Sequence, residues 1–221
     1  MNFSKTKKYI SQHIELFGDE IFAPIHGSYI KTSNNFGSFH ESLNSFKASI
    51  ENCEKCNLSL TRNKFVFGSG DPNADLLLIG EGPGKDEDLV GEPFVGKSGK
   101  LLDKILKAIG YARYENVFIS NIVKCRPPEN RNPLSSEIEK CTPYLNSQIN
   151  IIKPKLIVAL GKVAGQTLLK NDLMIKEMRE ITYNYNAIPL VVTYHPAALL
   201  RNPSLKKDVW KDFQFIRDFM K

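Results

Sequence analysis

Four short, continuous hydrophobic runs stand out along the chain, and each is rich in branched side chains. Runs of this kind are typical of strands in a sheet whose two faces are both covered. The sequence therefore predicts four strands, at Asp75–Gly80, Asn116–Asn121, Lys155–Leu160 and Ile188–Tyr194.

Helical patterns fill the intervals between these runs. Hydrophobic residues recur with helical spacing over Gly99–Ile109 and over Leu205–Met220. Ser136 and Glu139 resemble a capping box that opens a helix ending at about Ile152. The alternation predicts a parallel sheet flanked by helices, with the working residues in loops at the carboxyl ends of the strands.

The N-terminal part of the chain has a different pattern. Residues 3–22 indicate an amphipathic helix, and the Gly-, Ser- and Asn-rich residues 24–38 indicate a linker. A second helix is predicted over Phe39–Asn52. We therefore expect a helical extension and linker over residues 1–38 and one globular domain over residues 39–221.

Composition narrows the class of protein only slightly. Of 221 residues, 42% are hydrophobic and 24% are charged, as in an ordinary soluble domain, and no membrane span is expected. The formal net charge of +6 is mild. It points to nucleic acid only if the basic side chains gather on one face.

The four cysteines form a pattern that suggests one metal site. Cys53 and Cys56 make a Cys-x-x-Cys pair, and Cys125 and Cys141 follow far downstream. Four thiolates can hold a [4Fe–4S] cluster or a structural zinc, and the spacing does not separate the two. Disulfides are the alternative, but the absence of a secretion signal favours reduced thiols in the cytoplasm.

The loops that follow the predicted strands contain four distinctive motifs. These are GEGPG at 80–84, PFVGKSG at 93–99, NIVKCRPP at 121–128 and HPAALLRNP at 195–203. In this order, and with the same cysteine layout, they resemble the iron–sulfur, thermophilic-type uracil-DNA glycosylases known as family 4. The resemblance covers about residues 50–221, and Gly82 stands where alanine is commoner in that family.

The resemblance implies a fold, an activity and a cofactor. The fold is a three-layer α/β/α sandwich with a central, mostly parallel four-stranded sheet. The activity is the hydrolysis of the bond between uracil and its sugar in single- and double-stranded DNA, which leaves an abasic site for base excision repair. The cofactor is a [4Fe–4S] cluster on the four cysteines, and the protein is expected to be a cytoplasmic monomer. No Lys occupies a motif position suited to Schiff-base chemistry, so strand cleavage is not expected.

Residue chemistry fits the roles that the resemblance implies for the uracil pocket. An Asn carboxamide accepts from uracil N3–H and donates to O4, whereas cytosine presents the opposite pattern; this role falls to Asn121, whose ordinary role would be to end a strand. Phe94, otherwise a core residue, would stack on the flipped base. His195, otherwise structural, would donate to uracil O2 as negative charge develops there.

The acidic and DNA-contacting residues complete the predicted site. Glu81, beside Gly82, would orient water or stabilise the sugar, although capping or solvation is its ordinary role. Glu87 would close the pocket near uracil C5, with Asp88 holding that loop. Lys97 and Ser98 open a helix suited to a phosphate. The last group is predicted to fill the space that the flipped base leaves in the stack: Leu199, Leu200 and Arg201. Alternatively, the apolar residues of this group pack within the loop.

Two other functions are compatible with these patterns. One is a non-catalytic DNA-binding or polymerase-associated module of the same fold. The other is a zinc-stabilised hydrolase of a different substrate. The presence of both Asn121 and His195 favours the glycosylase over the first, and iron in place of zinc would favour it over the second.

Overall fold

The computed structural model describes residues 43–221. The predicted helix over residues 3–22, the linker and the start of the helix at Phe39 lie outside the described residues. The division at residue 38 therefore stays a prediction.

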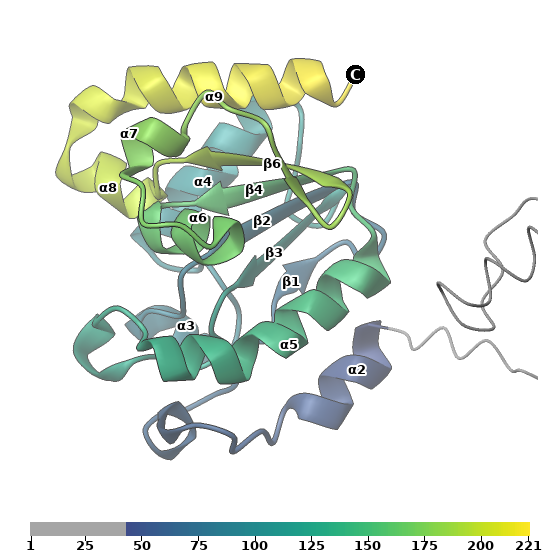
Figure 1. The fold of residues 1–221 in the computed structure, drawn as a ribbon, viewed down its shortest axis with the longest axis vertical. Coiled ribbons are helices and arrows are strands. Elements are labelled where there is room, and N and C mark those ends of the chain that lie inside the picture. The colour runs from purple at the N-terminus through teal and green to yellow at the C-terminus, as the bar shows by residue number, and fades with distance from the viewer. Residues whose placement is uncertain (1–42) are drawn as a thin grey trace, which may run out of the picture. The chain divides into compact units, whose positions relative to one another are not determined.

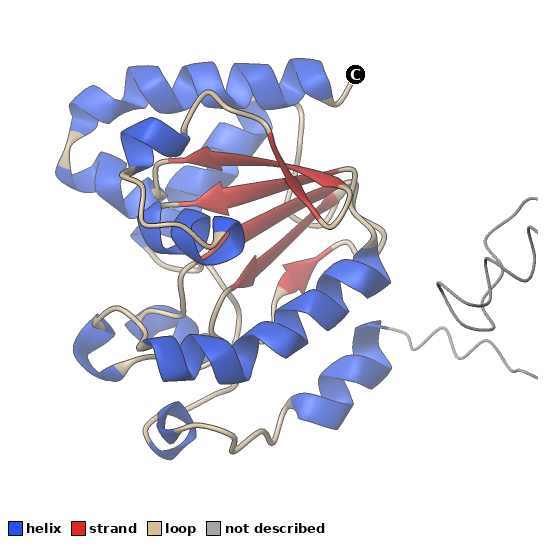
Figure 2. Ribbon diagram, in the orientation of Figure 1, coloured by secondary structure: helices blue, strands red, loops and turns tan. Residues whose placement is uncertain are grey.

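A six-stranded sheet forms the centre of the described domain (Figures 1 and 2). Its order is β1-β3-β2-β4-β6-β5, and the four central strands are parallel to one another. The strands are β1 (Ser69–Gly70), β2 (Leu76–Gly80), β3 (Val117–Asn121), β4 (Leu156–Leu160), β5 (Tyr183–Tyr185) and β6 (Ile188–Thr193). The four predicted strands are confirmed to within one residue at either end.

The prediction of four strands missed the two edges of the sheet. β1 pairs antiparallel with β3, and β5 pairs antiparallel with β6. Neither edge strand forms a hydrophobic run, because β1 is Ser-Gly and β5 is Tyr-Asn-Tyr. Pairing to a neighbouring strand places both in the sheet, and β5 adds two half-buried tyrosines that pack against the core.

Helices cover both faces of the sheet. They are α2 (Leu43–Ile50), α3 (Lys85–Val90), α4 (Lys97–Ala108), α5 (Ser135–Ile152), α6 (Lys162–Leu169), α7 (Ile175–Met178), α8 (Pro196–Arg201) and α9 (Lys206–Phe219). Short 3₁₀ helices lie at Asn57–Leu60, Pro128–Asn130 and Pro203–Leu205. The α/β class and the layered arrangement are confirmed.

Successive side chains of the central strands enter two separate hydrophobic cores. Along β2, Leu77 and Ile79 pack with residues of α2, α5 and α6. Leu76 and Leu78 pack on the other face, with residues of α4, α8 and α9. This two-sided burial explains why the strand sequences are continuously apolar rather than alternating.

The start of α5 differs from the prediction. The helix begins at Ser135, and the carboxylate of Glu137, not that of Glu139, accepts a hydrogen bond of 2.7 Å from the backbone N–H of Leu134. Arg131 donates two hydrogen bonds to the same carboxylate, at 2.9 and 2.7 Å. A carboxylate with a bidentate arginine partner is the stronger cap, and the sequence pattern at Ser136 does not reveal that partner.

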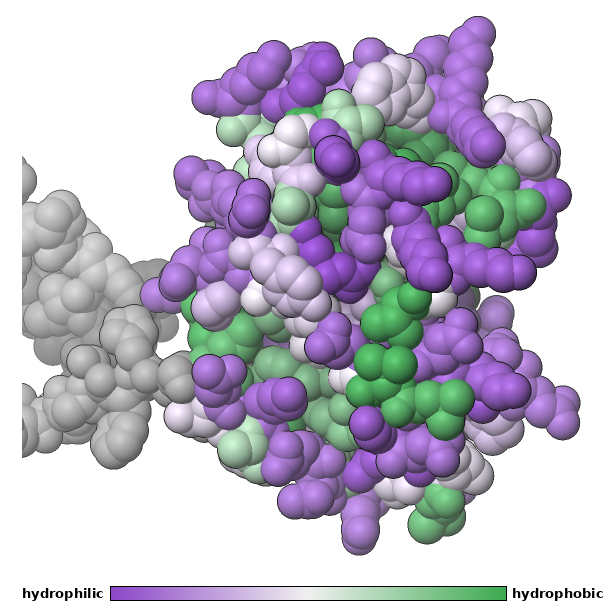
Figure 3. All heavy atoms as spheres, turned by 180° about the vertical axis from the view of Figure 1, so that it is seen from behind, coloured by the Kyte–Doolittle hydropathy of each residue, from purple (hydrophilic) through white to green (hydrophobic). Residues whose placement is uncertain are grey.

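The face opposite to the view of Figure 1 is mostly covered by hydrophilic side chains, with hydrophobic groups gathered in separate patches (Figure 3). Within residues 43–221, no helix combines the length and hydrophobicity needed to cross a bilayer.

Candidate active site

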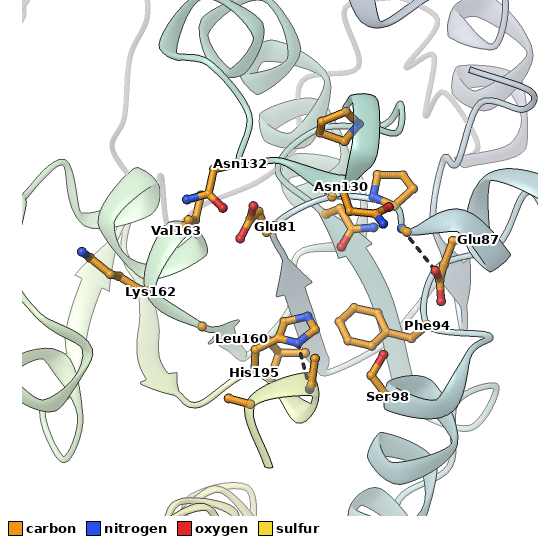
Figure 4. Close-up of a pocket in the computed structure, with 18 of the residues that line it drawn as sticks. Glu81, Glu87, Phe94, Ser98, Asn130, Asn132, Leu160, Lys162, Val163 and His195 are labelled. Carbon is orange, nitrogen blue, oxygen red and sulfur yellow. Dashed lines mark hydrogen bonds between the residues drawn. The ribbon is translucent and has the colours of Figure 1, made fainter. Parts of the chain in front are cut away.

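A cavity of about 610 Å³ lies at the carboxyl ends of the parallel strands. The chain passes from β2 to β3 on one side and later to β4 on the other, so the cavity lies at a topological switch point, where open α/β sheets bind ligands. Its lining includes a residue at or just after each central strand: Glu81, Asn121, Gly161 and His195 (Figure 4).

Asn121 presents an unpaired acceptor at this cavity. The residue is 2% exposed, and Oδ1 has no hydrogen-bond partner among residues 43–221. Gly80 pairs with Asn121 across β2 and β3, and a Cβ at Gly80 would lie 2.5 Å from Oδ1 and 2.8 Å from the Phe94 ring. Buried polar atoms are almost always paired. Asn121 Oδ1 is unpaired, and Gly80 leaves space beside it. This arrangement therefore indicates a ligand that donates a hydrogen bond to Oδ1.

A buried lysine fixes the backbone at Asn121. Lys124 is fully buried, and its Nζ donates to Ser120 Oγ, to the Asn121 carbonyl at 2.8 Å and to Gln148 Oε1 at 2.6 Å. Burial lowers the pKa of Lys124 to about 8. Sequence reasoning missed this residue, although a Lys among the apolar residues before Cys125 was a visible signal.

Phe94 and His195 stack on one another beside Asn121. Their ring centroids are 5.2 Å apart and their planes differ by 27°. His195 Nδ1 accepts a hydrogen bond of 3.1 Å from the backbone N–H of Ala197 (Figure 4). Burial, assisted by the positive charge of Arg201, lowers the pKa of His195 to about 4. The ring is therefore neutral at pH 7, with its proton on Nε2, which makes Nε2 a hydrogen-bond donor.

The two glutamates at the cavity have different environments. The Glu81 side chain extends into the cavity (Figure 4), its carboxylate makes no hydrogen bond within the described residues, and burial raises its pKa. Glu87 Oε1 accepts from the backbone N–H groups of Val95 and Gly96 at 2.9 and 3.0 Å, and its Oε2 accepts from Gly84 N–H at 3.2 Å. Glu81 is therefore free to bind a ligand or water, whereas Glu87 holds the wall of the cavity in place.

Asp88 anchors the same wall from behind. The side chain is buried, and Oδ1 accepts from the backbone N–H of Asn63 at 2.9 Å. Oδ2 accepts from Asn63 Nδ2 at 2.5 Å. These bonds join α3 to the segment that follows the Cys53–Cys56 pair, as expected of a residue that holds the loop.

Comparison with known proteins identifies the family. The family model for the uracil-DNA glycosylase superfamily matches residues 67–214, which is more than half of the chain. The chain belongs to this superfamily. Proteins named type-4 uracil-DNA glycosylase are similar to it over most of their length. The one from Sulfurisphaera tokodaii is 43% identical over 186 residues, covering 80% of this chain and 84% of its own. The one from Archaeoglobus fulgidus is 42% identical over 184 residues (80% and 92%), and the one from Saccharolobus solfataricus is 41% identical over 177 residues (76% and 82%).

The rim of the cavity in this superfamily member contains only part of the predicted DNA-contacting set. Ser98 and Arg201 line the cavity, and Lys97 is exposed at the first turn of α4. Leu200 is 48% exposed, but Leu199 is 2% exposed and belongs to the core with α4 and α9. The two leucines therefore cannot act together as a wedge, because α8 turns them to opposite environments. The lining residues that the sequence missed include polar and charged ones: Asn130, Arg131, Asn132 and Lys162.

All four cysteines of this superfamily member are free. Arg62 Nη1 donates to the carbonyl of Cys53 at 2.6 Å and to Cys125 Sγ at 3.2 Å. Burial raises the pKa of Cys125 to about 11, and the charges of Cys56 and Cys141 contribute to the rise. In the part of the chain that the structure describes, no three His, Cys, Asp or Glu side chains are arranged to hold a metal ion. The metal site stays a prediction.

Proposed function

We propose that the cavity binds a uracil flipped out of DNA and that the protein hydrolyses the bond between this base and its sugar. The observation that carries the proposal is the unpaired Oδ1 of Asn121, which faces a cavity beside a stacked Phe94 and a neutral His195. Membership of the uracil-DNA glycosylase superfamily supports the same activity. A base inside a duplex must leave the stack before its glycosidic bond can be reached.

Recognition of uracil follows from the donors and acceptors of Asn121. Oδ1 accepts from uracil N3–H, and Nδ2 donates to O4, so cytosine would place acceptor against acceptor and donor against donor. Phe94 stacks on the base. The Glu87 carboxylate, held by three backbone N–H groups, makes the wall near C5 rigid. A rigid wall is needed because excluding one methyl group gives only about 10- to 200-fold discrimination.

The chemistry divides between His195 and Glu81. A water attacks the sugar C1′, and the C1′–N1 bond breaks, so that its electron pair leaves with uracil as an anion. The Nε2–H of His195 donates to uracil O2 and stabilises that charge. The carboxylate of Glu81 accepts the proton of the attacking water. It is available for this because no side chain or backbone group of residues 43–221 donates a hydrogen bond to it. The products are free uracil and an intact strand with an abasic site.

The rim residues would bind the DNA strand around the extruded nucleotide. Ser98 and Lys97 at the N-terminus of α4 suit a phosphate. Arg201 adds a positive charge at the cavity, and Leu200 fills the vacated stack. The protein acts on single- and double-stranded DNA as a cytoplasmic monomer.

The four cysteines would hold a [4Fe–4S] cluster. Support comes from the donor set, which consists of four free thiols, and from Arg62, which places a positive charge beside the site by donating to Cys125 Sγ. When bound, the cluster cross-links the Cys53–Cys56 segment, the loop after Asn121 and α5. Its role is structural, because no residue of the cavity is a cysteine. The alternative is a zinc ion in the same site, and metal analysis distinguishes zinc from the iron of a cluster.

The experiment that tests the function is incubation with an oligonucleotide that contains one uracil, followed by alkali. We expect strand breaks at the uracil only after alkali, which indicates an abasic site without strand cleavage. His195→Ala should slow single-turnover excision by about 10² to 10³, with affinity for the uncleaved duplex unchanged. Duplex binding without excision by the wild-type protein would favour the non-catalytic module instead.

A further inference from the structure

Arg113 lies in the connection between α4 and β3 and is almost buried. Its side chain is 10% exposed, although it is a charged residue in a surface loop. Nη1 donates to the carbonyl of Pro93 at 2.7 Å, and Nη2 donates to the carbonyl of Phe94 at 2.8 Å. Asp103 on α4, whose side chain is 47% exposed, also pairs with Nη2 at 3.0 Å. Arg113 thus binds the backbone on both sides of the Phe94 Cα.

The opposite side of the same backbone segment is held by Glu87. Its Oε1 accepts from the N–H groups of Val95 and Gly96, while Arg113 donates to the carbonyls of Pro93 and Phe94. Four consecutive residues are therefore held by two charged side chains. Within this segment Glu87 binds N–H groups and Arg113 binds carbonyls, which is the pairing that their charges favour.

Phe94 needs this support because its backbone conformation is unfavourable. Its φ is +56°, in the left-handed region that residues other than glycine rarely adopt. A Cβ at Gly99 would lie 1.6 Å from the Phe94 carbonyl oxygen, so the backbone at Phe94 is packed directly against α4. Strained residues of this kind persist only where the surrounding structure holds them.

We propose that Arg113 is a positioning residue, which sets the Phe94 ring against His195 and against the flipped base. The effect of Arg113 on excision rests on the proposed function. The effect of Arg113 on the position of Phe94 rests on the structure alone. Lysine cannot replace Arg113, because one ammonium lacks the planar fork that reaches two carbonyls and a carboxylate. Arg113 does not itself line the cavity, and it contacts the lining through the Phe94 carbonyl, so it acts through Phe94.

The test is a double-mutant cycle with single-turnover excision of uracil. We expect Arg113→Gln to slow excision by about 10- to 100-fold, as a misplaced substrate contact does. In the Phe94→Ala background, the same substitution should cause no further loss, because its only route to the base is gone. Multiplicative losses in the double variant would overturn the inference. Asp103→Asn is the matched control, since it leaves both carbonyl contacts in place, and its effect should stay below about twofold.

A second readout does not depend on activity. The NMR shifts of the His195 ring protons report the stacked Phe94 ring, and Arg113→Gln should change them in the folded protein while Asp103→Asn should not. Arg113→Lys serves if the Gln variant does not fold, with the same expected shift change. Unchanged His195 shifts in a folded Arg113 variant would overturn the inference. Lack of uracil excision by the wild-type protein would overturn the proposed function. The NMR test of the Arg113 role would remain valid, because it does not depend on activity.

Discussion

Single polar atoms without partners determine what the cavity can bind. Asn121 Oδ1 is buried and unpaired, and the Glu81 carboxylate makes no hydrogen bond within residues 43–221. Leaving a buried group unpaired costs about 1 to 3 kcal/mol. The neighbouring polar groups are paired, as Lys124 and Glu87 show. The polar groups assigned to the substrate therefore lower the stability of the folded protein, whereas the hydrogen-bonded groups that support them do not.

Asn121→Ala should reduce uracil excision without destabilising the protein. The substitution removes an acceptor that uracil N3–H needs, so single-turnover excision should fall by at least about tenfold, in line with about 1 to 3 kcal/mol for a lost partner. The free energy of unfolding should stay the same or increase, because Oδ1 has no partner in the part of the folded chain that the structure describes. Asn121→Asp should weaken uracil excision and admit cytosine. Undiminished excision by Asn121→Ala would show that another group recognises the base.

His195 should titrate near pH 4, far below an exposed histidine. Burial lowers its pKa from 6.5 to about 4 in the folded protein, so the unfolded chain binds the proton first as the pH falls. The contribution of His195 to the free energy of unfolding is therefore complete above about pH 6.5 and is lost as the pH falls towards 4. NMR of the imidazole nitrogens should show the Nε2–H tautomer at pH 7. A midpoint near 6.5 would contradict the proposed neutral donor.

At the scale of elements, α8 divides its residues between the core and the DNA side. The helix begins after His195, which caps it by accepting a hydrogen bond at Nδ1 from the backbone N–H of Ala197. Leu199 enters the core, and the next residue, Leu200, is exposed. The predicted wedge therefore reduces to one leucine.

Leu200→Ala should reduce excision from double-stranded DNA more than from single-stranded DNA, because only the duplex has a stack to refill. The ratio of the two single-turnover rates is the measurement. Leu60→Ala is the matched control, since Leu60 is 81% exposed and does not line the cavity, and it should change neither rate. Leu199→Ala should instead lower the free energy of unfolding by about 2 to 5 kcal/mol. Equal losses on both substrates for Leu200→Ala would contradict the wedge role.

For the molecule as a whole, the sequence predicted the central strands because each is buried on both faces. It missed β1 and β5, which are placed by backbone pairing, and it missed the cap of α5, which depends on Arg131. The site residues at strand ends were visible as motifs. Arg113 and Lys124 were not found, because their roles depend on which carbonyls the fold brings within reach. The sequence also could not show that Leu199 and Leu200 lie in different environments.

The purified protein, prepared without oxygen, should contain iron and sulfide in the ratio of one [4Fe–4S] cluster per chain. Cys125→Ser should lose iron, visible absorption and thermal stability together, because the free energy of metal binding contributes to folding. Asn57→Ser is the matched control, since Asn57 is exposed and next to Cys56, and it should retain all three. Stoichiometric zinc without iron would refute the cluster and favour a structural zinc.

The most direct test of the account is the identity of the base that the protein releases. Three duplexes that differ only in one uracil, thymine or cytosine are incubated with excess protein, and the released bases are identified by mass spectrometry. The account predicts one free uracil per uracil-containing duplex, intact strands before alkali, and no thymine or cytosine. Release of another base at a comparable rate, or no released base with a folded protein, would contradict it.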